Sequence, residues 1–364
     1  MRLFLCGDVM TGRGIDQILP HPCEPMLHEP HMRSALGYVK LAESRSGEIP
    51  RAVPFDYIWG DALDEIDRRE PDLRIVNLET SVTADGQPEP KGINYRMHPA
   101  NLGCLAAADI DCCVLANNHV ADWGSAGLKN TLCAIQQAGF ATAGAGLDAD
   151  AAASPAMLEA SPGKRLLVFA FACPSSGVPE HWAAAKNWPG VNVLASLDED
   201  ALTSVIHSID RWRRPGDIVL VSIHWGANWG YEVPAAHIRF AHDLIDSARV
   251  DIVHGHSSHH PLAIEVHAGK PILYGCGDFI NDYEGIGGHE AYRPELSLAY
   301  FIDLDDVSHT RLRMEMVPFR VHKFQLVRAS EVETAWLGQT LDRECRRFGR
   351  HIRLSDQRTL MLSA

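Results

Sequence analysis

Residue types that commonly bind metal ions recur where apolar runs of this sequence end. The run VDIV leads directly into HGHSSHH, residues 254–260, which holds four histidines. Other such positions, each at the end of an apolar run, are Asp8, Glu79, Asn118, His119 and His224. Carboxylate, carboxamide and imidazole groups in this mixture suit Mn, Fe or Zn better than Ca or Mg. Two such ions sharing a carboxylate would lower the pKa of a bridging water and generate hydroxide near neutral pH.

The elements that must position these residues are short strands alternating with helices. Apolar runs predict strands at 2–5, 73–76, 112–116, 166–172, 218–223 and 271–274. Helix-period patterns predict helices at 127–140, 201–212 and 234–250. This alternation is typical of a mostly parallel sheet covered by helices. Because ligands of α/β proteins bind at the carboxyl edge of the sheet, we expect the strand-end residues to converge in one site.

Composition and charge narrow the class of protein. Apolar residues make up 46% of the chain and charged residues 22%, as in ordinary globular proteins. The net charge of −14 argues against binding to a nucleic-acid backbone, which needs a cationic surface. A small anionic substrate is compatible with this charge, because a bound metal ion reverses the local field.

The sequence gives no sign of a membrane span or of disulfides. No run approaches the roughly 18 apolar residues of a transmembrane helix. The apolar stretch in MRLFLCGDVM is too short for a signal peptide, so we expect it to form the first strand of a cytoplasmic protein. The nine scattered cysteines are expected to be free, largely buried thiols.

A series of motifs, taken in order, resembles the CapA (poly-γ-glutamate synthesis protein) family of the calcineurin-like metallophosphoesterase superfamily. The motifs are GDVMTGRG, NLETSVT, ANNHVADWG, SIHWG, GHSSHHPLAIEV and YGCGDF, and they span residues 1 to about 282. The resemblance implies an α/β fold, specifically a four-layer α/β/β/α sandwich, with a dinuclear metal site. We expect this domain over residues 1–302, with inserted loops at about 20–55, 84–99 and 174–197. Residues 303–364 are expected to form a strand-and-helix extension packed on the same domain.

The resemblance also assigns roles to individual residues. The implied metal ligands are Asp8, Glu79 (the bridging acid), Asn118, His224, His256 and His259. His119 is the implied general acid or charge stabiliser beside the leaving group, and Asp8 shares in catalysis. The sequence departs from the superfamily at Met10, where phosphoesterases usually carry a histidine ligand. His254 has a superfamily spacing to His256, so it remains an alternative ligand.

Several polar residues near these motifs are candidates for binding the substrate. Arg13, in TGRG, carries a guanidinium that suits phosphate or carboxylate, and an exposed arginine is the alternative. Asn117 precedes the Asn-His motif, where a turn is the alternative. Lys91, Arg96 and His98 lie in the long polar loop and are expected to line the substrate wall.

Three functions follow from these expectations. The first is a phosphoesterase-like hydrolase that uses a metal-bridging hydroxide, with two ions of Mn, Fe or Zn, on a small anionic substrate. The second is a CapA-type accessory protein or enzyme of poly-γ-glutamate or γ-glutamyl biosynthesis, which binds a polycarboxylate without phosphoester hydrolysis. The third is a mononuclear iron enzyme that uses two histidines and one carboxylate.

Overall fold

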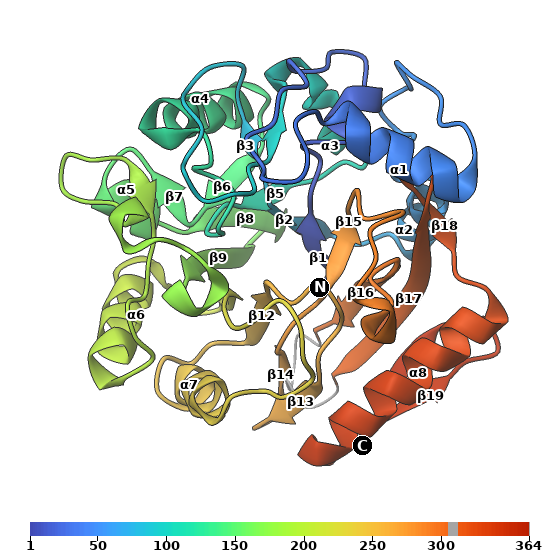
Figure 1. Ribbon diagram of the computed structural model, residues 1–364. Helices are drawn as coiled ribbons and strands as arrows, with labels where there is room; N and C mark the ends of the chain where they lie inside the picture. The colour runs from blue at the N-terminus through green and yellow to red at the C-terminus, as the bar shows by residue number, and fades with distance from the viewer. Residues whose placement is uncertain (305–311, 364) are drawn as a thin grey trace.

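The computed structural model describes residues 1–304 and 312–363, and these residues fold around two β-sheets (Figure 1). The larger sheet has ten strands in the order β19-β20-β17-β16-β1-β2-β5-β6, with β15 beside β1 and β18 beside β17. Its bounds are β1 (Arg2–Val9), β2 (Leu73–Leu78), β5 (Cys112–Val114), β6 (Ala141–Ala143), β15 (Asp278–Ile280), β16 (Leu296–Asp303), β17 (Arg313–His322), β18 (Gln325–Arg328), β19 (His351–Leu354) and β20 (Leu360–Ser363). β1, β2, β5 and β6 run parallel, and β15 runs parallel to β1.

The second sheet has six strands in the order β13-β14-β12-β11-β9-β8. Its bounds are β8 (Ala156–Ser161), β9 (Lys164–Ala172), β11 (Ile218–His224), β12 (Ile252–His256), β13 (Ile264–His267) and β14 (Lys270–Leu273). β9, β11, β12 and β14 are parallel, and antiparallel strands flank them. Two small ribbons pair β3 (Ser81–Val82) with β4 (Arg96–Met97) and β7 (Ala145–Gly146) with β10 (Gly190–Val191).

Helices surround the sheets (Figure 1). The α-helices in the described part of the chain are α1 (Leu36–Ser46), α2 (Asp61–Arg69), α3 (Gly103–Ala106), α4 (Gly124–Gln137), α5 (Ala149–Ala153), α6 (Glu199–Trp212), α7 (Ala235–Asp246) and α8 (Glu331–Cys345). One apolar core holds side chains of both sheets, among them Leu5, Val168 and Ile252. A second core joins the six-stranded sheet to α6 and α7 through residues such as Val205, Leu244 and Val221.

The α/β class expected from the sequence is confirmed, although the parallel strands are divided between two sheets. The apolar runs marked the strands but carried no information on which sheet each strand joins. The predicted helices correspond to α4, α6 and α7, with ends shifted by a few residues. Residues 313–363 add four strands to the ten-stranded sheet, while residues 305–311 of the expected extension lie outside the described part.

The three inserted segments differ in secondary structure. The insertion at 20–55 contains α1, and those at 84–99 and 174–197 hold only short strands and 3-10 turns.

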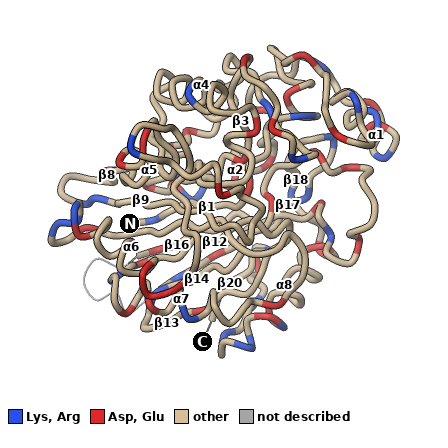
Figure 2. Tube along the Cα trace, turned by 60° about the vertical axis from the view of Figure 1, so that its left-hand side comes forward, with Lys and Arg blue, Asp and Glu red and all other residues tan. Residues whose placement is uncertain are grey.

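All nine cysteines are free, and every one except Cys133 is buried. Acidic and basic residues are interspersed along the chain (Figure 2). No described helix has the length and apolar character required to cross a bilayer.

Two glycines let strands approach closely beside the strand-end residues. A Cβ on Gly7 would lie 1.7 Å from the carbonyl oxygen of Gly277, where β1 passes the start of β15. A Cβ on Gly255 would lie 2.5 Å from the carbonyl oxygen of Tyr274. Both distances are far below van der Waals contact, so only glycine fits. Asp8 and His256, their neighbours in the chain, are therefore held in closely packed strands.

Candidate metal centre

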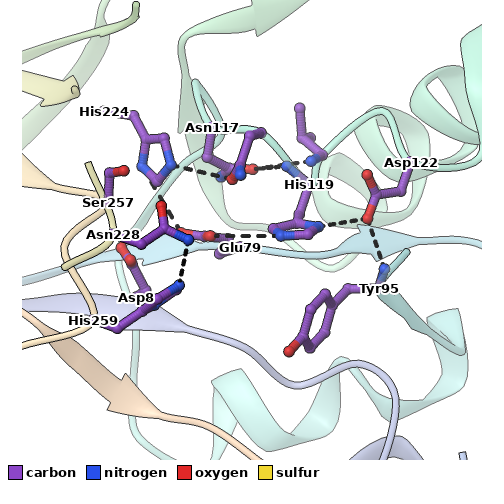
Figure 3. A network of polar contacts seen from close by, with 12 residues as sticks. Asp8, Glu79, Tyr95, Asn117, His119, Asp122, His224, Asn228, Ser257 and His259 are labelled. Atoms are coloured by element: carbon purple, nitrogen blue, oxygen red, sulfur yellow. Dashed lines mark hydrogen bonds and ion pairs between the residues drawn. The ribbon is translucent and has the colours of Figure 1, made fainter. Parts of the chain in front are cut away.

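Two overlapping groups of buried side chains at the carboxyl edges of both sheets have the composition of metal ligands. One group is Asp8, His224 and His256, and the other is Asp8, His259 and Asp278. In each group the candidate ligand atoms all lie within 4.8 Å of one another. Asp8 belongs to both groups. Residues from distant parts of the sequence thus converge, as the strand-end pattern predicted (Figure 3).

Asp278 is a candidate ligand that the sequence interpretation missed. It opens β15 and is the register partner of Asp8 on the parallel strand β1. Its carboxylate forms a group with candidate ligand atoms of Asp8 and His259, all within 4.8 Å of one another. A sequence signal existed, because Gly277-Asp278 follows the run PILY much as Gly7-Asp8 follows RLFL.

One oxygen of the Asp8 carboxylate accepts a hydrogen bond, and the other has no hydrogen-bond partner. Oδ1 accepts a hydrogen bond of 2.7 Å from Nδ2 of Asn77, whereas the fully buried Oδ2 has no partner. Asn77 also donates to Oε2 of Glu79 at 3.0 Å. Burial and the nearby Asp278 carboxylate raise the pKa of Asp8 to about 7, and burial together with Asp8 raises the pKa of Glu79 well above its usual value. A buried cluster of carboxylates with an unpaired oxygen has the chemistry that a divalent cation neutralises.

His224 and His256 supply neutral imidazoles to the same place. They end β11 and β12 and are register partners, with their Nδ1 atoms 2.7 Å apart. Burial lowers the pKa of both well below the ordinary value, which keeps them in the neutral form that binds metals. Nε2 of His256 contacts Oγ of Ser222 at 2.7 Å, and Nε2 of His224 contacts Oδ1 of Asn118 at 3.1 Å.

His254 joins the two sheets. Its Nε2 lies 2.9 Å from the carbonyl oxygen of Cys6 in β1, and its Nδ1 lies 3.1 Å from Oγ of Ser222. Both ring nitrogens therefore have partners within the fold. His254 and His256 lie on the same face of β12, because strand residues two apart share a face, but His254 is further from the carboxyl end.

His259 reaches the centre from the turn after β12. Ser257 in this turn has a φ of 103°, a conformation that L-residues rarely adopt and that is found at functional sites. Nδ1 of His259 lies 2.8 Å from Oδ1 of Asp278, and Nε2 lies 3.0 Å from Nδ2 of Asn228. Burial disfavours the imidazolium of His259, but the Asp278 and Asp8 carboxylates outweigh it and raise the pKa.

His119 is oriented beside this centre by an acidic partner (Figure 3). Its Nδ1 lies 2.6 Å from Oδ2 of Asp122, and its Nε2 lies 3.9 Å from Oε1 of Glu79. The ring packs edge-on against Tyr95, with centroids 4.7 Å apart. Burial lowers the pKa of His119 to about 4 although Asp122 opposes the shift. A neutral imidazole with one nitrogen held by a carboxylate is suited to proton transfer at the other.

The substrate-binding candidates other than Arg13 fall into three different environments. Lys91 lies at the centre, where Nζ is 2.7 Å from Oδ1 of Asp122 and also contacts the carbonyl oxygen of Asn118. Arg96 and His98 instead line a separate cavity of about 500 Å³ beside Trp123. Asn117 is fully buried, and its amide bonds the Asn77 side chain and nearby backbone groups.

Arg13 is neither exposed nor free to meet a substrate. Its guanidinium makes a two-pronged ion pair with Asp282, at 2.8 and 2.5 Å, and a further one of 3.2 Å with Glu29. The side chain is 2% exposed, and its charged group lies 3.7 Å from the ring centroid of Tyr38. The interpretation of Arg13 as a substrate-binding residue missed Asp282 because that carboxylate lies 269 positions later in the chain.

Known proteins resemble this chain over most of its length. The family model described as bacterial capsule synthesis protein PGA_cap matches residues 2–283. A probable polyglutamine synthesis accessory protein of Mycobacterium tuberculosis is 48% identical over 349 residues, which cover 95% of this chain and 92% of the relative. PGA biosynthesis protein CapA of Bacillus subtilis is 28% identical over 257 residues, covering 70% of this chain and 63% of the relative. The predicted kinship with CapA is thereby confirmed, and the chain belongs to the bacterial capsule synthesis protein PGA_cap family.

Proposed function

We propose that this protein acts in the synthesis of a glutamyl polymer, and that a divalent-metal centre in it holds a carboxylate-bearing substrate. The names of its relatives, a polyglutamine synthesis accessory protein and a PGA biosynthesis protein, support the pathway. The single observation that carries the metal centre is the buried, unpartnered Oδ2 of Asp8 within two groups of candidate ligands.

The residues that would hold the metal follow from these groups. His224 and His256 would hold one ion and His259 and Asp278 a second, with Asp8 between them and Glu79 and Asn118 beside the first. When bound, Mn, Fe or Zn supplies positive charge that attracts carboxylates or phosphates and polarises their oxygens. A single ion among Asp8, His224 and His256 is the alternative, and it would match the two-histidine, one-carboxylate iron type.

A metal ion at this centre would supply the positive charge that an anionic substrate requires. The overall charge of −14 repels polycarboxylates, so a local cationic field is required to bind one. Lys91 stands at the edge of the centre with a side chain that is 19% exposed. Its positive charge would attract a carboxylate that approaches the metal ligands.

Phosphoester hydrolysis is a second candidate, which the arrangement of His119 favours. Asp122 fixes the ring through Nδ1, and Nε2 faces Glu79, so the neutral His119 ring is placed to take part in proton transfer at Nε2 beside the proposed metal ions. The four-layer α/β/β/α order and a cytoplasmic location remain parts of this proposal. The shared core of the two sheets and the packing of α6 and α7 support the layer order.

Binding of a defined polymer tests the first candidate. Protein loaded with Mn is titrated with poly-γ-glutamate of defined length in a calorimeter, beside Glu79→Gln and the surface control Arg211→Met. We expect binding by the wild type and the control and loss of binding in Glu79→Gln. Equal binding by all three proteins, or binding by none, would contradict the proposal. An aryl phosphate ester assay on the same samples measures the second candidate, which requires metal-dependent turnover.

A further inference from the structure

A second cluster of histidines and carboxylates lies on the surface between α7 and β13. His242, Glu265 and His267 offer ligand atoms that all lie within 4.8 Å of one another. Nε2 of His242 is 2.9 Å from Oε1 of Glu265, and Nε2 of His267 is 2.9 Å from Oδ2 of Asp246. We call these four residues the α7–β13 cluster.

The spacing of the four residues presents them as two pairs on facing elements. His242 and Asp246 are four residues apart on α7, so they lie on one side of the helix. Glu265 and His267 are two residues apart on β13 and share a face of the strand. The two imidazole rings stack with centroids 3.9 Å apart and an angle of 9° between their planes.

This cluster is separate from the metal centre described above. His267 pairs with Lys270 at the start of β14, and Lys270 makes an ion pair of 2.6 Å with Asp251, just before β12 begins. The cluster therefore lies toward the amino ends of the parallel strands, whereas His224 and His256 stand at their carboxyl ends.

We propose that the α7–β13 cluster binds one transition-metal ion of the Zn²⁺ type, which fastens α7 to β13. His242, Glu265 and His267 supply three ligands of a tetrahedral zinc site, with bonds of about 2.0–2.2 Å, and Asp246, which contacts His267, is the candidate for the fourth. In such a tetrahedron neighbouring ligand atoms are about 3.3 Å apart. The nitrogen–oxygen contacts of 2.9 Å are close to this spacing, and the two stacked rings would have to tilt out of their parallel arrangement for both nitrogens to face one ion.

One ligand of the cluster is already fixed by an outer partner. The hydroxyl of Tyr274 donates a hydrogen bond of 2.6 Å to Oε2 of Glu265, which leaves Oε1 facing His242. Carboxylate ligands of metals are commonly held by such second contacts. The histidines are reachable from solvent, since the side chains of His242 and His267 are 30% and 26% exposed.

Metal counting and Co²⁺ spectroscopy test the proposal. Full-length protein stripped with chelator is titrated with Co²⁺ and separately with Zn²⁺, for the wild type, His242→Gln, His267→Gln and the control His207→Gln on α6. We expect the wild type and control to bind one equivalent more than the two cluster variants. We also expect a tetrahedral Co²⁺ absorption band that both cluster variants lose, and that Glu79→Gln, altered at the other centre, retains.

Thermal unfolding supplies an independent measurement. Excess Zn²⁺ should raise the melting temperature of Glu79→Gln, and combining this change with His267→Gln should reduce the rise, because an ion that binds only the native state stabilises it. Circular dichroism checks that each variant is folded, and Glu265→Gln serves as a further variant if one of the histidine changes prevents folding. Equal metal content and equal thermal shifts with and without the cluster histidines would overturn the proposal. The α7–β13 cluster would then be two hydrogen-bonded histidine–carboxylate pairs.

Discussion

His224 and His256 are register partners on adjacent parallel strands, and their Nδ1 atoms lie 2.7 Å apart. Both rings are neutral because burial lowers their pKa. Only one of the two nitrogens can donate a hydrogen to the other, while Asp8 and Glu79 carboxylate oxygens lie 4.0 and 3.8 Å away. A cation among these four groups would be held by both imidazoles and both carboxylates, which makes this pair of histidines the focus of the proposed centre.

Ser222 should affect the metal affinity of His224 and His256. Its Oγ lies 2.7 Å from Nε2 of His256, so it orients the ring whose Nδ1 faces the proposed ion. Loss of such an outer partner typically weakens metal binding about 10–100-fold. We expect Ser222→Ala to show this loss in competition with a chromophoric chelator, and Ser208→Ala on α6 to show none. Unchanged affinity in Ser222→Ala would mean that His256 does not bind the ion.

Metal affinity should depend on pH through Asp8. The pKa of about 7 in the metal-free protein lies above the ordinary value, so the carboxyl is largely protonated at pH 6 and ionised at pH 8. Below this pKa an incoming cation must displace a proton, and the affinity should therefore rise as pH increases from 6 to 8. Calorimetry at both values, in two buffers of different ionisation enthalpy, measures the released proton. A pH-independent affinity would rule out Asp8 as a ligand.

His119 should matter for proton transfer and not for holding the metal. Its Nδ1 is taken by Asp122, and no candidate ligand group includes it among the described residues. If the centre hydrolyses an ester, His119→Gln should retain metal while kcat falls about 10²–10⁴-fold. If the centre only binds a polycarboxylate, the same variant should bind poly-γ-glutamate as the wild type does. Loss of metal from His119→Gln would contradict both expectations.

Arg13 should be a determinant of stability. Removing it leaves the buried carboxylates of Asp282 and Glu29 without their cation, and breaking a buried ion pair in this way costs about 3–5 kcal/mol. We expect Arg13→Met to lower the free energy of unfolding by that amount in urea denaturation. The exposed pair Arg211–Asp150 provides the control, since Arg211→Met should cost less than about 1 kcal/mol. Similar losses in the two variants would show that the Arg13 network contributes no more than a surface pair.

The sequence identified candidate residues of the site more readily than their arrangement in the fold. Asp8, Glu79, His224 and the histidines of HGHSSHH could be singled out because polar residues at the ends of apolar runs converge at a sheet edge, whereas the choice of His256 and His259 rested on the resemblance to the CapA family. The nearness of Asp278 to Asp8 depends on β15 lying beside β1, which no local pattern encodes. For the same reason, no local sequence pattern could predict that Arg13 is buried against Asp282.

The choice between His254 and His256 shows the limit of local patterns most clearly. Both share one face of β12, and alternation along a strand cannot say which ring reaches the edge. The contact of His254 with Cys6 requires the six-stranded sheet to meet β1 of the other sheet. This packing, and not the spacing HGH, separates the two histidines.

Anomalous scattering from crystals grown with Mn tests the proposed centre most directly. Data collected on both sides of the metal absorption edge should show two peaks that share Asp8, one beside His224 and His256 and the other beside His259 and Asp278. A single peak beside His224 and His256 would favour the mononuclear alternative. Absence of any peak among these residues, in protein whose metal content has been measured before crystallisation, would contradict the metal centre itself.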